Sequence, residues 1–267
     1  MNNNLGVFTK NKFDLVVSLG EDCACTSYLR RCNLQHNSYP FDWLTNAPFE
    51  NRINLVVNDF KNFLNFEDLV LMEKPTEFPS DIHHDYYENK STDFYHWHDF
   101  PADIPLNDSY SFVNEKYQRR IERLYNDIEN SQKILFVWLS HSKLHSKEEI
   151  TEAYKKLSER FAGKEIYQLI IENSTENNLV KLENNHIAIV HQDTISDDKK
   201  HHYDQTMGNK TNNLKIIKKI KINTTFWGKI KRFFFIFCKL IIILIPNKKL
   251  KNQFKQNLNM FFYHAKL

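Results

Sequence analysis

Short apolar runs that alternate with segments of helical period constrain the fold of this chain more than any other feature. Four runs are short, rich in β-branched or aromatic residues and low in charge, as buried strands are: residues 13–19, 133–139, 166–171 and 187–190. Four segments between them carry apolar residues at helical spacing: residues 21–32, 49–64, 113–128 and 148–161. The alternation predicts an α/β fold, in which helices flank a mostly parallel sheet in a three-layer, SGNH- or Rossmann-like arrangement.

Residues 72–110 interrupt this alternation. The stretch is rich in Pro, His, Tyr and Asp, and it predicts a long irregular loop of the kind that often carries function. The chain has only five glycines, so neither of the phosphate-binding motifs G-x-G-x-x-G and G-x-x-x-x-G-K-[ST] can be written in it. Nucleotide binding by these two devices is excluded, and no cofactor is expected.

The charge of the chain is divided unevenly along its length. Residues 200–267 contain 15 Lys and Arg against one acid, Asp204, which gives +14. The formal net charge of the whole chain is +3, so residues 1–199 carry 3 − 14 = −11. This division predicts an acidic domain over residues 1–205 and a basic tail over residues 206–267 that meets a polyanion.

Within the tail, residues 224–246 have the composition of an amphipathic helix, with Trp227, a cluster of cations and a Phe-rich run. The solidly apolar part, residues 233–245, would span about 20 Å as a helix, short of the ~30 Å hydrocarbon core, and it contains Lys239. We therefore expect a helix lying on an anionic membrane surface, with packing against its own domain as the alternative. Nucleic acid is not expected, because the cations alternate with long apolar runs.

No basic segment followed by an apolar run opens the sequence, so no secretory signal is expected. The four cysteines are then expected to stay reduced in the cytoplasm, with the protein peripheral on the inner membrane face.

Cys23 is the first candidate catalytic residue. It follows a predicted strand and opens a predicted helix, where the helix dipole favours a thiolate and where parallel sheets bind ligands. Two observations oppose this reading: free cysteines are often small buried core residues, and the carboxylates of Glu21 and Asp22 disfavour a thiolate.

His98 is the candidate base for this thiol, since a thiol nucleophile needs a histidine and the imidazole needs an orienting acceptor. Asp99 adjoins it, but neighbouring residues on an extended segment point apart, so Asp42 is the preferred acceptor. The alternative is a histidine that only packs beside an aromatic ring.

Other residues allow other functions. The histidines and aspartates of residues 83–99 allow a metal-dependent hydrolase, although H-E-x-x-H is absent and no metal is expected. A helical basic stripe suits either a phosphate or carboxylate ligand or a solvated face: Lys116, Arg119, Arg120 and Arg123. An aromatic platform allows a non-catalytic glycan- or partner-binding module: Tyr39, Phe41, Trp43 and Trp97.

Several motifs occur in one order: S-L-G-x-x-C at 18–23, L-R at 29–30, S-Y-P-F-D-W at 38–43, H-D-F at 98–100 and K-Y-x-R-R-I at 116–121. Together they resemble the bacterial domain of unknown function labelled "putative papain-like cysteine peptidase". The resemblance implies a thiol hydrolase or transferase that cleaves an amide, ester or thioester, with a lipid-linked or envelope-glycan substrate as one expectation. It implies Cys23 as nucleophile, His98 as base and Asp42 as orienting residue. The residues expected around the substrate are Ser18, Gly20, Trp43, Arg119 and Arg120.

Overall fold

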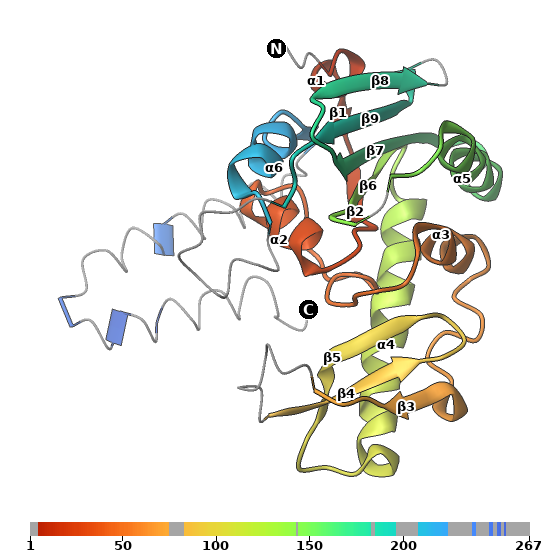
Figure 1. The fold of residues 1–267 in the computed structure, drawn as a ribbon, viewed down its shortest axis with the longest axis vertical. Coiled ribbons are helices and arrows are strands. Elements are labelled where there is room, and N and C mark those ends of the chain that lie inside the picture. The colour runs from red at the N-terminus through yellow and green to blue at the C-terminus, as the bar shows by residue number, and fades with distance from the viewer. Residues whose placement is uncertain are drawn as a thin grey trace.

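A five-stranded sheet forms the centre of the protein (Figure 1). The computed structural model describes residues 5–74, 83–142, 144–182, 185–195 and 208–223, with a few isolated positions between 237 and 254. The strands of the sheet lie in the order β2 (Leu15–Ser18), β6 (Lys133–Leu139), β7 (Glu165–Asn173), β9 (Ile187–Gln192) and β8 (Asn178–Leu182). The first four run parallel, and β8 pairs antiparallel with β9 at one edge. The carboxyl ends of four strands therefore lie along the same edge.

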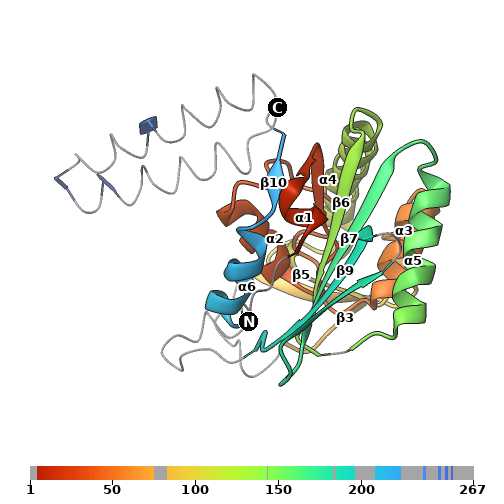
Figure 2. The same ribbon diagram turned by 90° about the horizontal axis from the view of Figure 1, so that it is seen from above.

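Helices cover both faces of this sheet (Figure 2). One face packs against α3 (Phe49–Val57) and α5 (Lys147–Arg160), and the other against α2 (Cys23–Arg31), α6 (Lys210–Ile217) and the short α1 (Val7–Lys10). Alternate residues of each strand point to opposite faces, so a strand such as β6, buried over residues 134–139, contributes to both cores. This explains the continuous apolar runs of the sequence.

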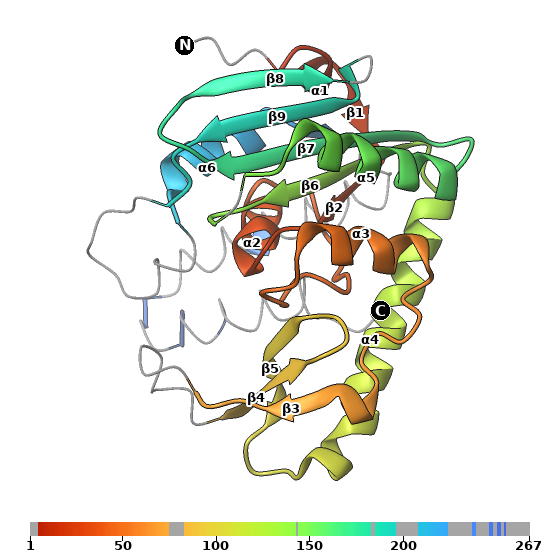
Figure 3. The ribbon, with the colours of Figure 1, turned by 45° about the vertical axis from the view of Figure 1, so that its right-hand side comes forward.

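A second sheet, antiparallel and three-stranded, lies apart from the first against the long helix α4 (Leu106–Glu129) (Figure 3). It consists of β3 (Leu69–Leu71), β4 (His84–Asn89) and β5 (Phe94–Pro101), and the 3-10 turn η1 (Phe66–Asp68) leads into it. The prediction of an irregular loop over residues 72–110 was wrong. Buried positions of β5 are occupied by the polar residues His96 and Asp99, and this hides the alternation that normally marks a strand.

The predicted α/β class is confirmed, and so are the predicted strands and helices of the main sheet. The sheets are mixed rather than uniformly parallel. The helix expected over 49–64 ends at Val57, because the chain then turns through Asp59, Phe60, Asn62 and Leu64, all with positive φ. An SGNH- or Rossmann-like topology stays a prediction.

Part of the segment assigned to the tail packs with the body. Ile216 and Ile217 of α6 are fully buried, and β10 (Lys221–Ile222) pairs with β1 (Lys12–Phe13). Residues 208–223 therefore belong with the acidic body, beyond the boundary predicted at 205. The predicted membrane segment, 224–246, lies almost wholly outside the described residues. Within the described part of the chain, no helix combines the length and apolarity that crossing a membrane requires.

Candidate functional site

Polar side chains gather where the parallel strands of the main sheet end. The turn after β2 carries Glu21, Asp22 and Cys23, and the adjacent strand β6 continues into Ser140, His141 and Ser142. Farther along the same edge lie Glu172 of β7, His191 of β9 and Thr194. Ligands of parallel sheets bind at this edge, so this cluster is the candidate site.

The turn after β2 is built by close packing. A Cβ on Gly20 would lie 2.1 Å from the Cβ of Cys25, so only glycine permits the helix to approach the strand this closely. The buried Ser18 hydroxyl accepts a hydrogen bond from the N–H of Gly20 at 3.3 Å. Ser18 and Gly20 thus shape the turn that presents Cys23, and Ser18 does so from inside the core.

Cys23 is the first residue of α2. Asp22 caps the helix by accepting a hydrogen bond from the N–H of Ala24 at 2.8 Å. The helix N-terminus alone would favour a thiolate, but burial and the charge of Asp22 raise the pKa of Cys23 to about 12. The expectation of a lowered thiol pKa was therefore wrong at this position. A reaction at Cys23 needs a base that removes the proton as the sulfur attacks.

This pKa predicts how Cys23 responds to alkylation. Below a pKa of about 12, the thiolate fraction rises about tenfold for each pH unit, so the labelling rate with iodoacetamide should rise without a plateau between pH 7 and pH 10. An unperturbed cysteine reaches its plateau near pH 9–10. Peptide mapping by mass spectrometry gives the rate at Cys23 itself. A plateau below pH 8 would show a resting thiolate and contradict this arrangement.

His141 contacts this turn through Asp22 and Glu21. Its Nδ1 lies 3.2 Å from the hydroxyl of Thr194, and that hydroxyl donates its proton to the carbonyl of Ser140 at 3.0 Å. Since a hydroxyl has one proton, Thr194 must accept from Nδ1–H, which leaves Nε2 as the basic nitrogen of the neutral ring. Nε2 is buried without a hydrogen-bond partner, 3.6 Å from a carboxylate oxygen of Asp22.

Asp22 is therefore close to both the thiol and the imidazole. Burial raises the pKa of Asp22, whereas the proximity of His141 lowers it. Gly208 packs behind the ring: its φ is +62°, and a Cβ there would lie 2.6 Å from Cε1 of His141 and 2.2 Å from the carbonyl oxygen of Thr194. Gly208 therefore restricts the imidazole at Cε1, and Thr194 holds it at Nδ1.

Two further buried groups lie near the same edge. The carboxylate of Glu172 accepts from Nδ1 of His145 at 2.6 Å and lies 3.4 Å from Nε2 of His191. Arg52 of α3 is fully buried and donates to the carbonyl of Glu21 at 3.0 Å. Burial lowers the pKa of Arg52 to about 9, so its guanidinium stays protonated at neutral pH, where it offsets the charge of the neighbouring Asp22 and Glu21.

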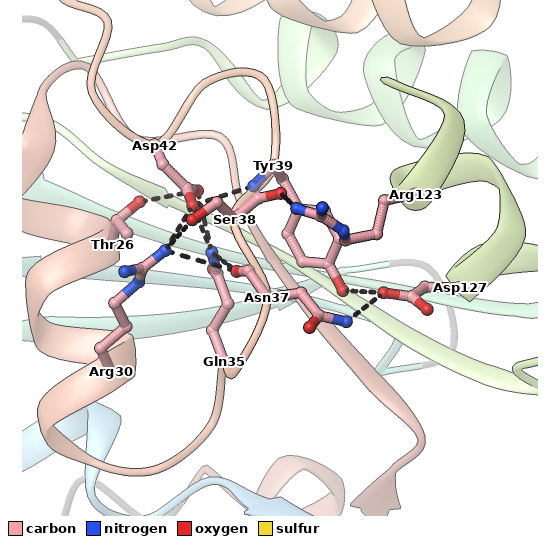
Figure 4. Close-up of polar contacts among 9 residues, drawn as sticks. All are labelled: Thr26, Arg30, Gln35, Asn37, Ser38, Tyr39, Asp42, Arg123 and Asp127. Carbon is pink, nitrogen blue, oxygen red and sulfur yellow. Dashed lines mark hydrogen bonds and ion pairs between the residues drawn. The ribbon is translucent and has the colours of Figure 1, made fainter. Parts of the chain in front are cut away.

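Asp42, the predicted orienting acid, belongs to a different cluster (Figure 4). Its fully buried carboxylate accepts from Arg30 at 3.1 Å, from Gln35 at 2.8 and 2.9 Å, from Thr26 at 3.1 Å and from the N–H of Tyr39 at 2.9 Å. A carboxylate has about four acceptor positions, and these donors fill them. Asp42 therefore orients no imidazole, and this part of the prediction is corrected. The carboxylate holds the 35–43 loop on α2.

The same loop is fastened to α4 (Figure 4). Arg123 donates to the carbonyl of Ser38 at 3.0 Å, and the hydroxyl of Tyr39 donates to Asp127 at 2.6 Å. The S-Y-P-F-D-W motif therefore joins two helices of the scaffold.

His98, the predicted base, is exposed on β5, with its ring edge-on to that of His84. His98 thus lies on the second sheet, and the carboxylate of Asp42 is occupied by its own donors, so the structure does not assemble Cys23, His98 and Asp42 as a triad. The neighbouring Asp99 is instead buried and accepts from His96, Lys116 and Tyr117 at 2.8, 2.5 and 2.7 Å. Burial alone would raise the pKa of Asp99, but these donors hold it far below its usual range.

The arginines predicted to contact substrate lie on α4, and the predicted tryptophan lies in the 35–43 loop. Arg119 is exposed and pairs with Glu115, and Arg120 stacks on the ring of Tyr117. Trp43 is half-buried beneath the guanidinium of Arg30. The basic stripe of α4 is therefore not a single surface.

The two alternative functions find little support in the geometry. Within the described ranges, no three His, Cys, Asp or Glu side chains converge as metal ligands would. Tyr39 and Phe41 of the expected aromatic platform are buried in the core, so they present no face to a glycan. The predicted platform is corrected on that ground.

Sequence reasoning missed His141 and Thr194. A usable signal existed for His141, because Ser140-His141-Ser142 directly follows the predicted strand 133–139, as Cys23 follows the first strand. Thr194 had no such signal, since its role depends on a contact with Ser140 across 54 residues of sequence.

Comparisons with known proteins bear on this site. A family model described as "Putative papain-like cysteine peptidase (DUF1796)" matches residues 14–175. One relative, "Uncharacterized protein R408" of Acanthamoeba polyphaga mimivirus, is 28% identical over 134 residues, which are 46% of this chain and 60% of the viral protein. The chain thus spans less than two thirds of that relative, and the relative is viral rather than bacterial. No solved structure matches the chain. Because the family model covers more than half of the sequence, including Cys23 and His141, the chain belongs to this family of peptidase-like hydrolases.

Proposed function

We propose that this protein is a thiol-dependent acyl hydrolase or transferase that acts on an amide, ester or thioester, with Cys23 as the nucleophile and His141 as the proton acceptor. One observation carries the proposal. Two adjacent parallel strands, β2 and β6, bring a helix-initiating cysteine and a histidine of fixed tautomer close to the same carboxylate, Asp22.

The chemistry follows from the protonation states. Cys23 rests as a thiol, so its sulfur attacks the acyl carbon while the S–H proton passes to Nε2 of His141. The proton then goes to the leaving amine, alcohol or thiol, and a thioester forms on Cys23. A water, or an acceptor alcohol or amine, attacks that thioester and releases the acyl group. Catalytic contacts of this kind tighten when substrate binds.

The direct test is a search for the thioester. p-Nitrophenyl acetate is mixed with the intact protein, and the acetylated residue is located by intact-mass measurement and peptide mapping. We expect acetyl on Cys23 that hydroxylamine removes. Acetylation confined to surface lysines, or spread equally over the cysteines, would reject the thiol mechanism.

The substrate side of the proposal rests on the tail sequence. A helix over residues 224–246 on an anionic membrane would bring the site to a lipid-linked or envelope-glycan substrate. Each cation near such a surface contributes about 1 kcal/mol, so changing Lys229, Lys231 and Arg232 to Gln should weaken binding to phosphatidylserine-containing vesicles about 100-fold.

Two controls accompany this vesicle measurement. The matched variant changes three exposed lysines of the body to Gln: Lys61, Lys155 and Lys181. This variant should bind as the unchanged protein does, and purely zwitterionic vesicles should bind neither protein well. Equal loss in the tail and body variants would mean that the tail has no special role.

A further inference from the structure

The turn that carries Cys23 and the loop that carries His141 are joined by one carboxylate. Glu21 accepts a hydrogen bond from the backbone N–H of His141 at 2.8 Å and from the hydroxyl of Ser140 at 2.9 Å, both on Oε2. Its other oxygen, Oε1, accepts from the hydroxyl of Ser142. All three donors belong to consecutive residues of the loop after β6.

Glu21 is itself held firmly. Its backbone N–H donates to the carbonyl of Leu139 at 3.1 Å, and its carbonyl accepts from the buried Arg52 at 3.0 Å. Burial alone would raise the pKa of Glu21, but the hydrogen bonds from Ser142, His141 and Ser140 outweigh it, so the pKa is lowered and the group stays ionised. An ionised, well-satisfied carboxylate of this kind defines the geometry of its donors.

We propose that Glu21 is the positioning residue of the site: its carboxylate fixes the Ser140–Ser142 loop against the Cys23 turn and so sets the place of the His141 ring. This inference rests on the proposed function of His141. Thr194 fixes the orientation of the ring through Nδ1, whereas Glu21 fixes the backbone position of the loop that carries the ring. The two contacts therefore restrict different degrees of freedom of His141.

Two substitutions of Glu21 distinguish the contribution of its hydrogen-bonding shape from that of its charge. In Glu21→Gln, the amide oxygen still accepts from the N–H of His141, and the amide NH₂ donates to the hydroxyl of Ser142, which accepts as readily as it donates. In Glu21→Ala, that N–H loses its acceptor and the loop is released from the turn. Glu21→Gln should therefore rescue what Glu21→Ala loses.

The experiment has two arms, which use the full chain. In the first, kcat and KM for p-nitrophenyl acetate are measured for the unchanged protein and both variants. We expect Glu21→Ala to lower kcat about 100-fold with KM within about threefold, and Glu21→Gln to stay within about fivefold, since a misplaced base loses its contribution of 10²–10⁴. An unchanged kcat in Glu21→Ala would overturn the inference.

The second arm does not depend on turnover. The Cε1–Hε1 NMR signal of His141, assigned with His141→Gln, should be single and sharp in the unchanged protein and in Glu21→Gln, and broadened or doubled in Glu21→Ala. The two claims fail on different results. If the unchanged protein forms no acyl-enzyme, the proposed function is rejected. If the His141 signal is unaltered in Glu21→Ala, the positioning role of Glu21 is rejected. If Glu21→Ala does not fold, Ser142→Ala, which removes one of the three donors, should shift the same signal, and no shift would overturn the inference.

Discussion

Replacing Asp42 with alanine is expected to lower the free energy of unfolding by about 3–5 kcal/mol, a large share of the 5–15 kcal/mol typical of a folded domain. The carboxylate is fully buried, and its loss would leave the guanidinium of Arg30 and the amide of Gln35 without their acceptor inside the protein. Urea unfolding followed by circular dichroism measures the difference.

Matched variants show whether the buried cluster is responsible. Asp103→Ala, at an exposed carboxylate, should change the free energy of unfolding by less than about 0.5 kcal/mol. Arg30→Met removes the ion pair but leaves three kinds of donor on Asp42, so it should cost less than Asp42→Ala. A cost below about 1 kcal/mol for Asp42→Ala would show that the cluster does not hold the loop on α2.

The second large effect concerns the chemistry. Cys23→Ala should abolish acyl transfer, and His141→Ala should lower kcat/KM by about 10²–10⁴-fold, the contribution of a positioned general base. His98→Ala should change kcat/KM by less than about twofold, because the exposed His98 ring lies against His84 on the second sheet. Rates are measured with p-nitrophenyl acetate at pH 7.5 on protein whose melting temperature is unchanged.

This comparison decides between two histidines. The sequence motifs place the base at His98, and the contacts of the structure favour His141. If His98→Ala removes the activity and His141→Ala does not, the motif assignment is right and the structure changes when substrate binds. Cys32→Ala provides the thiol control, since Cys32 caps the C-terminal end of α2, opposite the end that carries Cys23, and it should keep full activity.

The motifs on which the family resemblance rests divide into two physical groups. The S-L-G-x-x-C motif forms the turn at the carboxyl edge of the sheet. The others meet each other in the scaffold: Arg30 of L-R pairs with Asp42 of S-Y-P-F-D-W, and Asp99 of H-D-F pairs with Lys116 and Tyr117 of K-Y-x-R-R-I. These paired motif residues are therefore better explained by stability than by catalysis.

The sequence alone determined the four parallel strands of the main sheet and the place of Cys23 at the end of a strand, but not the antiparallel edge strand β8. Apolar runs and helical spacing are local properties, and each depends on a few neighbouring residues. The hairpin of β4 and β5 could not be predicted in the same way, because the buried His96 and Asp99 hydrogen-bond to each other across three residues and both contact Tyr117 of α4. From sequence alone a polar residue is predicted to be exposed, because the partner that allows it to be buried is not known.

Tertiary structure alone decided the partners of the charged residues and the state of the thiol. Helix position favours a thiolate at Cys23 and the neighbouring Asp22 opposes it; burial, which only the fold supplies, is the larger effect that raises its pKa. The assignment of Asp42 to a buried ion pair, and of Thr194 and Glu21 to the His141 loop, depends on contacts between residues 12 to 120 positions apart. Periodicity records which side of an element is buried, whereas electrostatics depends on which charges the fold places within a few ångströms of one another.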